Sequence, residues 1–335
     1  GINMLEYNLE RPEEKTFIVN EMVSIFDKLY DLKATGGPMF EQYMRNALLL
    51  LMEDMKYEPA TLMEVSRVFT DAAYRKRKLE RTRNPTVVDF WQKEAEKAGG
   101  EAALQNITPY ITSKFNTFTA NDYMRVIIGQ DRSSFNFREI MDQGKILLVN
   151  LSKGRIGDIN ANLLGMIFVG KILMAALSRV DISEESRRDF NLYIDEFQNF
   201  TTDSIATILS EARKYHLNLV VAHQFIAQLS EKIRDAVFGN VGSIVSFRVG
   251  VQDTEVLKKE FEPVFGEHDL SNVDNFNAYV RLLVGGQTTA PFNIRTIPLG
   301  VGDSDIGARI REASRARYGR AREEVEEAIY RRLRD

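Results

Sequence analysis

The chain has 335 residues, of which 44% are hydrophobic and 27% charged, a composition typical of a folded globular protein rather than a disordered one. Its formal charge of −4 excludes a protein that coats nucleic acid through bulk charge, so any nucleic-acid contact must be local. The absence of cysteine excludes disulfides and cysteine-ligated metals, and three histidines leave little scope for a histidine zinc site. The length favours two domains, or one large domain with an insertion.

The first third of the chain predicts helices. After the extended start "INMLEYN", Pro12 suits a first helical turn, and apolar residues then recur at helical spacing until "TGG" at 35–37. Further helical patterns, among them "PMFEQYMRNALLLLMEDM" and "TLMEVSRVFTDAAYRKRKLE", continue to about residue 128. We therefore predict an all-α domain over residues 12–130, with residues 1–11 as a strand or connector of a second domain.

The pattern changes after residue 130. The apolar run Ile146 to Leu151 predicts a buried strand, and "NLLGMIFVGKILMAAL" at 162–177 predicts a buried helix, because it is shorter than a membrane span and contains Lys171. We expect no membrane-crossing segment in the chain. The strands "FNLYID", "LNLVVAHQ" and "GSIVSFRVG" then alternate with helices over 203–215 and 226–238. This alternation predicts an α/β domain over 131–300, with a parallel sheet covered on both faces.

The C-terminal segment, residues 301–335, is rich in charge. From Asp303 onward it contains nine arginines and eight acidic residues, with few bulky apolar side chains. This balance predicts a solvated, loosely packed helical tail, and an arm that touches DNA is the alternative.

Two adjacent carboxylates, Asp195 and Glu196, directly follow the strand "NLYI". A hydrophobic strand that ends in Asp-Glu is the Walker B pattern of P-loop ATPases, in which the Asp holds Mg²⁺ and the Glu orients or deprotonates the attacking water. Magnesium prefers carboxylate and water oxygens, so this position at a sheet edge suits the ion. The alternative is that the pair merely ends a strand and caps the next helix.

Polar residues near the next strand support the catalytic interpretation. That strand ends in His223 and Gln224, and the ends of neighbouring parallel strands meet at one edge, where a glutamine can hydrogen-bond a terminal phosphate. We expect His223 to be a structural neighbour rather than a metal ligand. Arg213 and Lys214 precede the strand, and we select Arg213 as the candidate arginine finger that reaches a neighbouring subunit. A strand-end glutamine bonded to a loop, and a solvated arginine, are the alternatives.

The stretch "NLYIDEFQNF…ILSEARKYHLNLVVAHQF" resembles the TraG/TraD-type coupling proteins of conjugative type IV secretion, within the additional-strand P-loop ATPases that include FtsK-like and HerA-like DNA pumps. The resemblance extends through "KILLVNLSKGRIG" and "GSIVSFRVG", most of residues 135–298. It implies a partial RecA-like P-loop NTPase sheet with an all-α insertion domain.

Carried over residue by residue, the resemblance implies ATP and Mg²⁺ as cofactors. Asp195 is then the carboxylate that binds Mg²⁺ through water, Glu196 the catalytic acid, Gln224 the phosphate sensor and Arg213 the finger. Lys153 and Arg155 are weaker candidates for contact with DNA or phosphate, since a surface turn explains them equally well. The resemblance further implies a homohexamer that moves DNA, expected to be single-stranded, with a relaxase and secretion-channel proteins as partners.

The sequence departs from this family pattern in one respect: it contains no G-x-x-x-x-G-K-[ST] motif. Both "DQGKILL" and "VGKILM" lack the glycine spacing and the Ser or Thr after Lys. We therefore expect a C-terminal portion of a longer ATPase, inactive alone, whose P-loop and membrane anchor lie upstream and whose location is the cytoplasmic side of the membrane. The alternatives are a HerA-like or FtsK-like translocase of duplex DNA, and a docking module that does not hydrolyse ATP.

Overall fold

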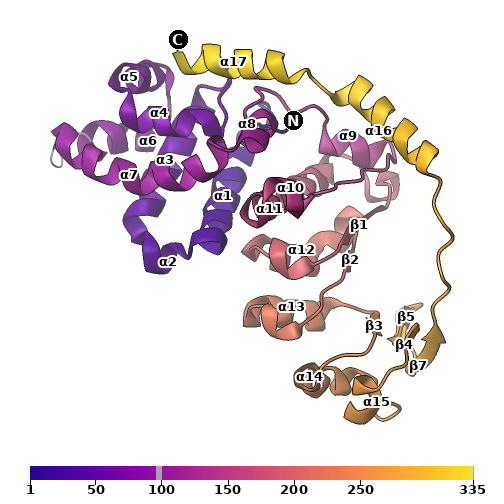
Figure 1. Cartoon of the computed structure of the whole chain (residues 1–335). Helices are drawn as coiled ribbons and strands as arrows, with labels where there is room; N and C mark the ends of the chain where they lie inside the picture. The colour runs from indigo at the N-terminus through magenta and orange to yellow at the C-terminus, as the bar shows by residue number, and fades with distance from the viewer. Residues whose placement is uncertain (96–99, 335) are drawn as a thin grey trace. The chain divides into compact units, whose positions relative to one another are not determined.

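The computed structural model describes residues 1–95 and 100–334 and divides the chain into two compact units (Figure 1). The helical unit comprises residues 1–178 and 308–335, and the α/β unit comprises residues 179–307. The C-terminal segment therefore returns to the unit in which the chain starts.

The helical unit contains long helices joined by short helical turns. Its elements are α1 (Glu14–Tyr30), α2 (Leu32–Thr35), α3 (Gly37–Glu53), η1 (Leu62–Glu64), α4 (Val65–Thr70), α5 (Ala72–Arg81), α6 (Pro85–Asp89), the π-helical η2 (Phe90–Ala95), α7 (Gly100–Thr119), α8 (Asp122–Ile128), α9 (Phe137–Asp142), α10 (Lys153–Ile156), α11 (Asp158–Leu177) and α17 (Arg322–Arg334), with most of α16 (Ser304–Tyr318). Side chains cap several of these helices: Asp71 accepts the Tyr74 N–H at the start of α5, and Asn121 accepts the N–H groups of Tyr123 and Met124 at the start of α8.

Helix α11 is the expected buried helix, and it packs against α1. By length and composition alone, residues 158–181 could cross a membrane, but 67% of the apolar window is buried inside the protein, as in a core helix. Lys171 lies within this helix and donates to the backbone oxygen of Glu6. Burial lowers the pKa of Lys171 to about 8, despite the opposing effect of nearby carboxylates.

One expected strand is absent from the described structure. Residues 146–151 form no strand, and the side chains of Ile146 and Leu148 are 87% and 80% exposed. A strand needs a neighbour for its backbone groups, and this run pairs with no described strand, so the prediction of a buried strand here is wrong. Residues 1–11, expected as a strand or connector, form turns and no strand, and Ile2, Met4 and Leu5 are buried there.

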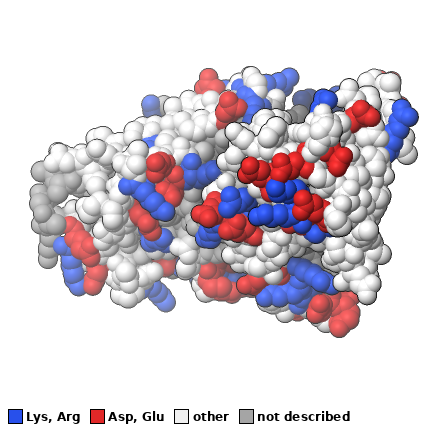
Figure 2. Space-filling model, turned by 90° about the horizontal axis from the view of Figure 1, so that it is seen from below, with Lys and Arg blue, Asp and Glu red and all other residues white. Residues whose placement is uncertain are grey.

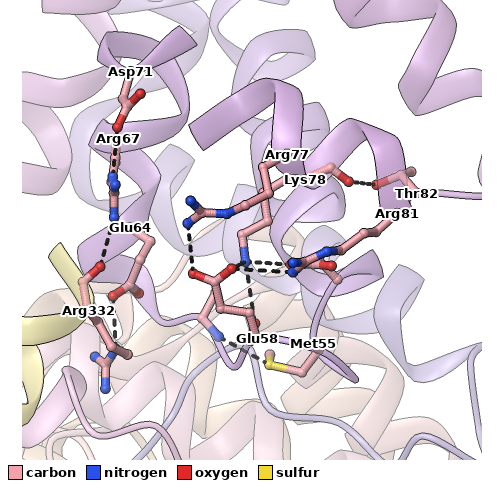
Figure 3. A network of polar contacts seen from close by, with 12 residues as sticks. Met55, Glu58, Glu64, Arg67, Asp71, Arg77, Lys78, Arg81, Thr82 and Arg332 are labelled. Carbon is pink, nitrogen blue, oxygen red and sulfur yellow. Dashed lines mark hydrogen bonds and ion pairs between the residues drawn. The ribbon is translucent and has the colours of Figure 1, made fainter. Parts of the chain in front are cut away.

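A buried ionic network links α5 to the loop between α3 and η1 (Figure 3). Lys78 Nζ lies 2.7 Å from Asp54 Oδ2 and 3.1 Å from Glu58 Oε2, and the side chains of Lys78 and Asp54 are fully buried. Arg81 Nη1 approaches the same Asp54 oxygen at 3.4 Å. Burial raises the pKa of Glu58, but Lys78, Arg77 and Arg81 outweigh it and hold the pKa below its usual value. Arg77, Lys78 and Arg81 of α5 are therefore used in ion pairs within the helical unit.

The two helices of the charged C-terminal tail, α16 and α17, differ in how they are packed. Almost all of α16 is exposed, as predicted, but α17 is packed against α8 and η1, so a uniformly loose tail is wrong. Val325 and Ile329 are buried beside Met63. Arg332 donates to Glu64 Oε1 at 3.1 Å and to the Gly129 oxygen at 2.5 Å. The sequence did not show this docking because its anchors are two apolar side chains and one arginine within a highly charged helix.

The α/β unit combines three small sheets with short helices. In chain order its elements are η3 (Ser178–Asp181), η4 (Glu184–Ser186), β1 (Phe190–Ile194), η5 (Phe197–Phe200), α12 (Asp203–Glu211), η6 (Ala212–Tyr215), β2 (Leu217–Val221), η7 (Ile226–Gln228), α13 (Glu231–Asn240), β3 (Ile244–Ser246), α14 (Val251–Phe261), α15 (Glu267–Ser271), β4 (Asn277–Arg281), β5 (Leu283–Val284), β6 (Gln287–Thr288) and β7 (Phe292–Arg295). Figure 1 shows α12 alongside β1 and β2, and α12 packs against α13.

The sheet topology confirms the α/β class and corrects the expected sheet. Strands β1 and β2 are parallel, with Phe190 opposite Leu217 and Ile194 opposite Val221. The other described strands pair in antiparallel fashion, in the order β3-β4-β7 and in the hairpin β5-β6. Alternate side chains on β1 and β2, including Tyr193 and Val220, are exposed. The parallel pair is therefore not covered on both faces by the described residues.

Candidate functional site

The carboxylate pair lies at the carboxyl end of β1, in a turn that is tied to β2. The Ala222 N–H donates to the Ile194 oxygen, and the Phe197 N–H donates to the Ala222 oxygen, both at 2.9 Å. Because β1 and β2 are parallel, their carboxyl ends share one edge. The structure thus brings Asp195 and Glu196 to the same edge as Gln224, as the strand pattern predicted.

Glu196 accepts side-chain hydrogen bonds from two glutamines at this edge. Its Oε1 accepts a hydrogen bond from Gln224 Nε2 at 2.6 Å, and its Oε2 accepts one from Gln198 Nε2 at 2.7 Å. Its backbone has φ 51° and ψ 43°, a left-handed conformation that non-glycine residues rarely adopt and that is concentrated at functional sites. The geometry places a partly exposed carboxylate where its two oxygens are directed by amide groups.

Gln198 was not predicted from the sequence. It stands two residues after Glu196 in "DEFQNF", whereas the strand pattern singles out only residues that immediately follow a strand. The 3-10 turn η5 folds the chain back at this point, and this fold brings the Gln198 side chain to the carboxylate.

Asp195 is exposed, and its Oδ1 accepts the backbone N–H of Glu196 at 2.9 Å. Among the described residues, no group of three or more His, Asp or Glu side chains could hold a metal ion. A magnesium ion that keeps several waters and is shared with substrate phosphates needs only one or two carboxylates, so Asp195 fits that mode of binding. A site formed by protein ligands alone does not fit.

Arg213 lies in η6, immediately before β2, and therefore at the opposite, amino end of the β1–β2 pair from Glu196. Its exposed side chain borders an open polar pocket of about 470 Å³. The pocket is lined by Glu184, Asp189, Ser210, Glu211, Arg213, Lys214, His216 and Asn218.

Lys214 and His216, the neighbours of Arg213 at this pocket, both have bonding partners within the chain. Lys214 lies 2.8 Å from Glu211, and this hydrogen bond raises the pKa of Lys214. His216 Nδ1 lies 2.9 Å from Asp189 Oδ1. No such bond to the Arg213 side chain occurs within the described residues. Because Arg213 and Glu196 lie at opposite ends of the strand pair, they do not form one site in the same chain.

His223, Lys153 and Arg155 make no described hydrogen bond or ion pair with Asp195, Glu196 or Gln224. His223 is half-buried, and its Nδ1 has no hydrogen-bond partner among the described groups. Lys153 and Arg155 are exposed on the short helix α10 in the helical unit, where Lys153 Nζ lies 3.9 Å from Asp158. Figure 2 shows basic and acidic side chains interspersed over the face that it displays, without a broad surface of one sign.

Comparison with known proteins identifies the region around the carboxylate turn. Residues 189–277 match the family model described as the TraM recognition site of TraD and TraG. This segment is of the TraG/TraD type. The match confirms the family inferred from the "NLYIDEFQNF" stretch, and it includes Asp195, Glu196, Arg213 and Gln224. Lys153 and Arg155 lie outside the matched TraG/TraD segment.

Two similar solved structures are both of the bacterial conjugative coupling protein TrwBdeltaN70. The unbound monoclinic form shares 16% identity, with 82% of this chain and 69% of that chain covered and a TM-score of 0.49. The trigonal form in complex with sulphate shares 17% identity, with 81% and 67% covered and a TM-score of 0.49. No curated protein matches the chain.

Proposed function

We propose that this chain is part of a type IV secretion coupling protein: an ATPase of the TraG/TraD type with a RecA-like core that moves DNA, or DNA with bound protein, toward a secretion channel. The observation that carries the proposal is the carboxylate turn, in which Glu196 lies 2.6 Å from Gln224 at one edge of a parallel strand pair, inside the TraG/TraD segment. Glu196 directly precedes η5, yet its side chain makes no capping hydrogen bond there and instead accepts hydrogen bonds from Gln224 and Gln198.

The chemistry assigned to these residues is hydrolysis of a nucleoside triphosphate. Asp195 would hold Mg²⁺ through water, and the ion would supply positive charge to the phosphates. Glu196 accepts a proton from the attacking water, and Gln224 hydrogen-bonds the terminal phosphate. A phosphate cradle must also be supplied, because the sequence has no P-loop motif.

The position of Arg213 supports a composite site in an oligomer. Because it lies at the opposite end of the strand pair from Glu196, Arg213 would act on nucleotide bound by a neighbouring subunit, in a homohexameric ring. The partners proposed with this role are single-stranded DNA, a relaxase and channel proteins, at the cytoplasmic face of the membrane. Lys153 and Arg155 remain candidates for contact with DNA.

The decisive experiment measures Mg²⁺-dependent ATP hydrolysis by the intact gene product, with and without single-stranded DNA. We expect hydrolysis that DNA stimulates and that Glu196→Gln abolishes. Duplex DNA of the same length tests the HerA-like or FtsK-like alternative, which predicts stronger stimulation by duplex. Full activity in Glu196→Gln would refute the catalytic assignment.

One observation favours a second function, a docking module. The matched family is described as a recognition site for TraM, and the pocket beside Arg213 lies almost wholly within that segment. A docking role predicts that purified relaxosome protein of the TraM type binds this chain without nucleotide. Binding that Arg213→Ala weakens, in a protein that never hydrolyses ATP, would favour docking over the motor.

A further inference from the structure

The Glu196 carboxylate has two amide donors that differ in origin and exposure. Gln198 comes from the same turn and is half-buried, and its own Oε1 is buried. Gln224 comes from the chain that follows β2 and is exposed. One donor is therefore built into the turn, while the other stands on the side that solvent and a ligand can reach.

Backbone hydrogen bonds in the turn fix the position of the Glu196 main chain, from which the carboxylate extends. Glu196 is held in its left-handed conformation by the N–H of Phe197 bonded to Ala222, and by its own N–H bonded to Asp195 Oδ1. With the backbone constrained in this way, the side-chain contacts decide the direction of the carboxylate. Each carboxylate oxygen has two lone pairs, so an amide on each oxygen orients the group without saturating it.

The two amides have different consequences for a reacting water. A water that is to lose a proton must approach an oxygen of Glu196 from the exposed edge, where Gln224 already donates to Oε1. Gln198 donates to Oε2 and leaves that approach open. Gln224 therefore stands in the exposed approach that the water would use, whereas Gln198 does not.

We propose that Gln198 is a positioning residue for hydrolysis: it holds Oε2 throughout, while Gln224 moves from Oε1 to the terminal phosphate when nucleotide binds. Oε1 then accepts the proton of the water as the water oxygen bonds to phosphorus and the bond from phosphorus to the leaving diphosphate oxygen breaks. This inference rests on the proposed function. It assigns the contact between Gln224 and Glu196 to the resting state.

The test measures kcat and the KM for ATP separately in variants of the intact protein. Gln198→Met keeps the length of the side chain but removes the donor, so we expect kcat to fall about 10-fold with the KM for ATP unchanged, since Gln198 touches only the carboxylate. Gln224→Met should raise KM as well. Gln228→Met, at an exposed glutamine in η7, is the matched control and should match wild type. A Gln198→Met enzyme with wild-type kcat would overturn the role of Gln198.

A second measurement examines the contact in this chain without any turnover. In protein with ¹⁵N-labelled glutamine, the side-chain amide signals of Gln198 and Gln224 should both shift when Glu196 is changed to Ala, and that of Gln228 should not. If the Gln198 signal does not respond, the positioning contact is refuted. An intact protein without ATPase activity would instead refute the proposed function, so the two failures are distinguishable.

Discussion

The buried pair Lys78–Asp54 gives a quantitative test of the helical unit. Both side chains are fully buried and their charged atoms are 2.7 Å apart, so Lys78→Met leaves the Asp54 carboxylate in the interior without its main partner. Loss of one member of a buried ion pair costs about 3–5 kcal/mol. Arg81 approaches the same carboxylate oxygen at 3.4 Å and partly compensates, so we expect a loss near the lower value, about 3 kcal/mol.

The assay can follow the helical unit alone. Trp91 is the single tryptophan of the chain, it is fully buried, and its Nε1 donates to the Asn46 oxygen inside this unit. Urea unfolding followed by its fluorescence therefore reports the free energy of unfolding of the helical unit without averaging over the α/β unit.

Two further variants separate the ion pair from general damage. Lys76→Met changes an exposed lysine of the same helix and should alter the free energy of unfolding by less than about 0.5 kcal/mol. The double variant Lys78→Met with Asp54→Leu removes both buried charges and should recover most of the loss. The reasoning is refuted if Lys78→Met is no less stable than Lys76→Met, or if the double variant is no more stable than Lys78→Met.

Three other predictions concern catalysis, the tail and pH. Glu196→Gln in the intact protein should lower kcat by about 100-fold or more while ATP still binds, measured by steady-state hydrolysis and nucleotide binding; unchanged kcat contradicts it. Ile329→Ala should cost about 2–4 kcal/mol of local stability and expose the arginines of α17 to trypsin, whereas Ile306→Ala on exposed α16 should not. Because the pKa of buried Lys171 is lowered to about 8, the unfolded state binds more protons above that pH, so stability should rise from pH 8 to 9.5; Lys171→Met should lose this rise.

Local sequence patterns were enough to predict the carboxylate edge and many helices of the helical unit. An apolar run followed by Asp195 and Glu196, with a second apolar run before Gln224, predicts two adjacent strand ends, because that arrangement follows from strand alternation and the shared edge of parallel strands. Helical spacing likewise predicts α1, α3 and α11, because the apolar pattern of a helix lies within one continuous stretch of sequence. The family could be inferred from the same short stretch.

The tertiary structure decided the features that depend on residues far apart in the chain. The run Ile146–Leu151 has strand-like composition, yet it forms no strand, because a strand requires a backbone partner that composition cannot specify. The docking of α17 depends on Arg332 meeting Glu64, a contact across 268 positions. The second amide on Glu196 came from a turn that brings Gln198 back to the carboxylate. Sequence by itself determined which residues could do chemistry at the strand edge, and only the folded chain decided which side chains surround them, because those contacts are set by the path of the backbone between distant segments.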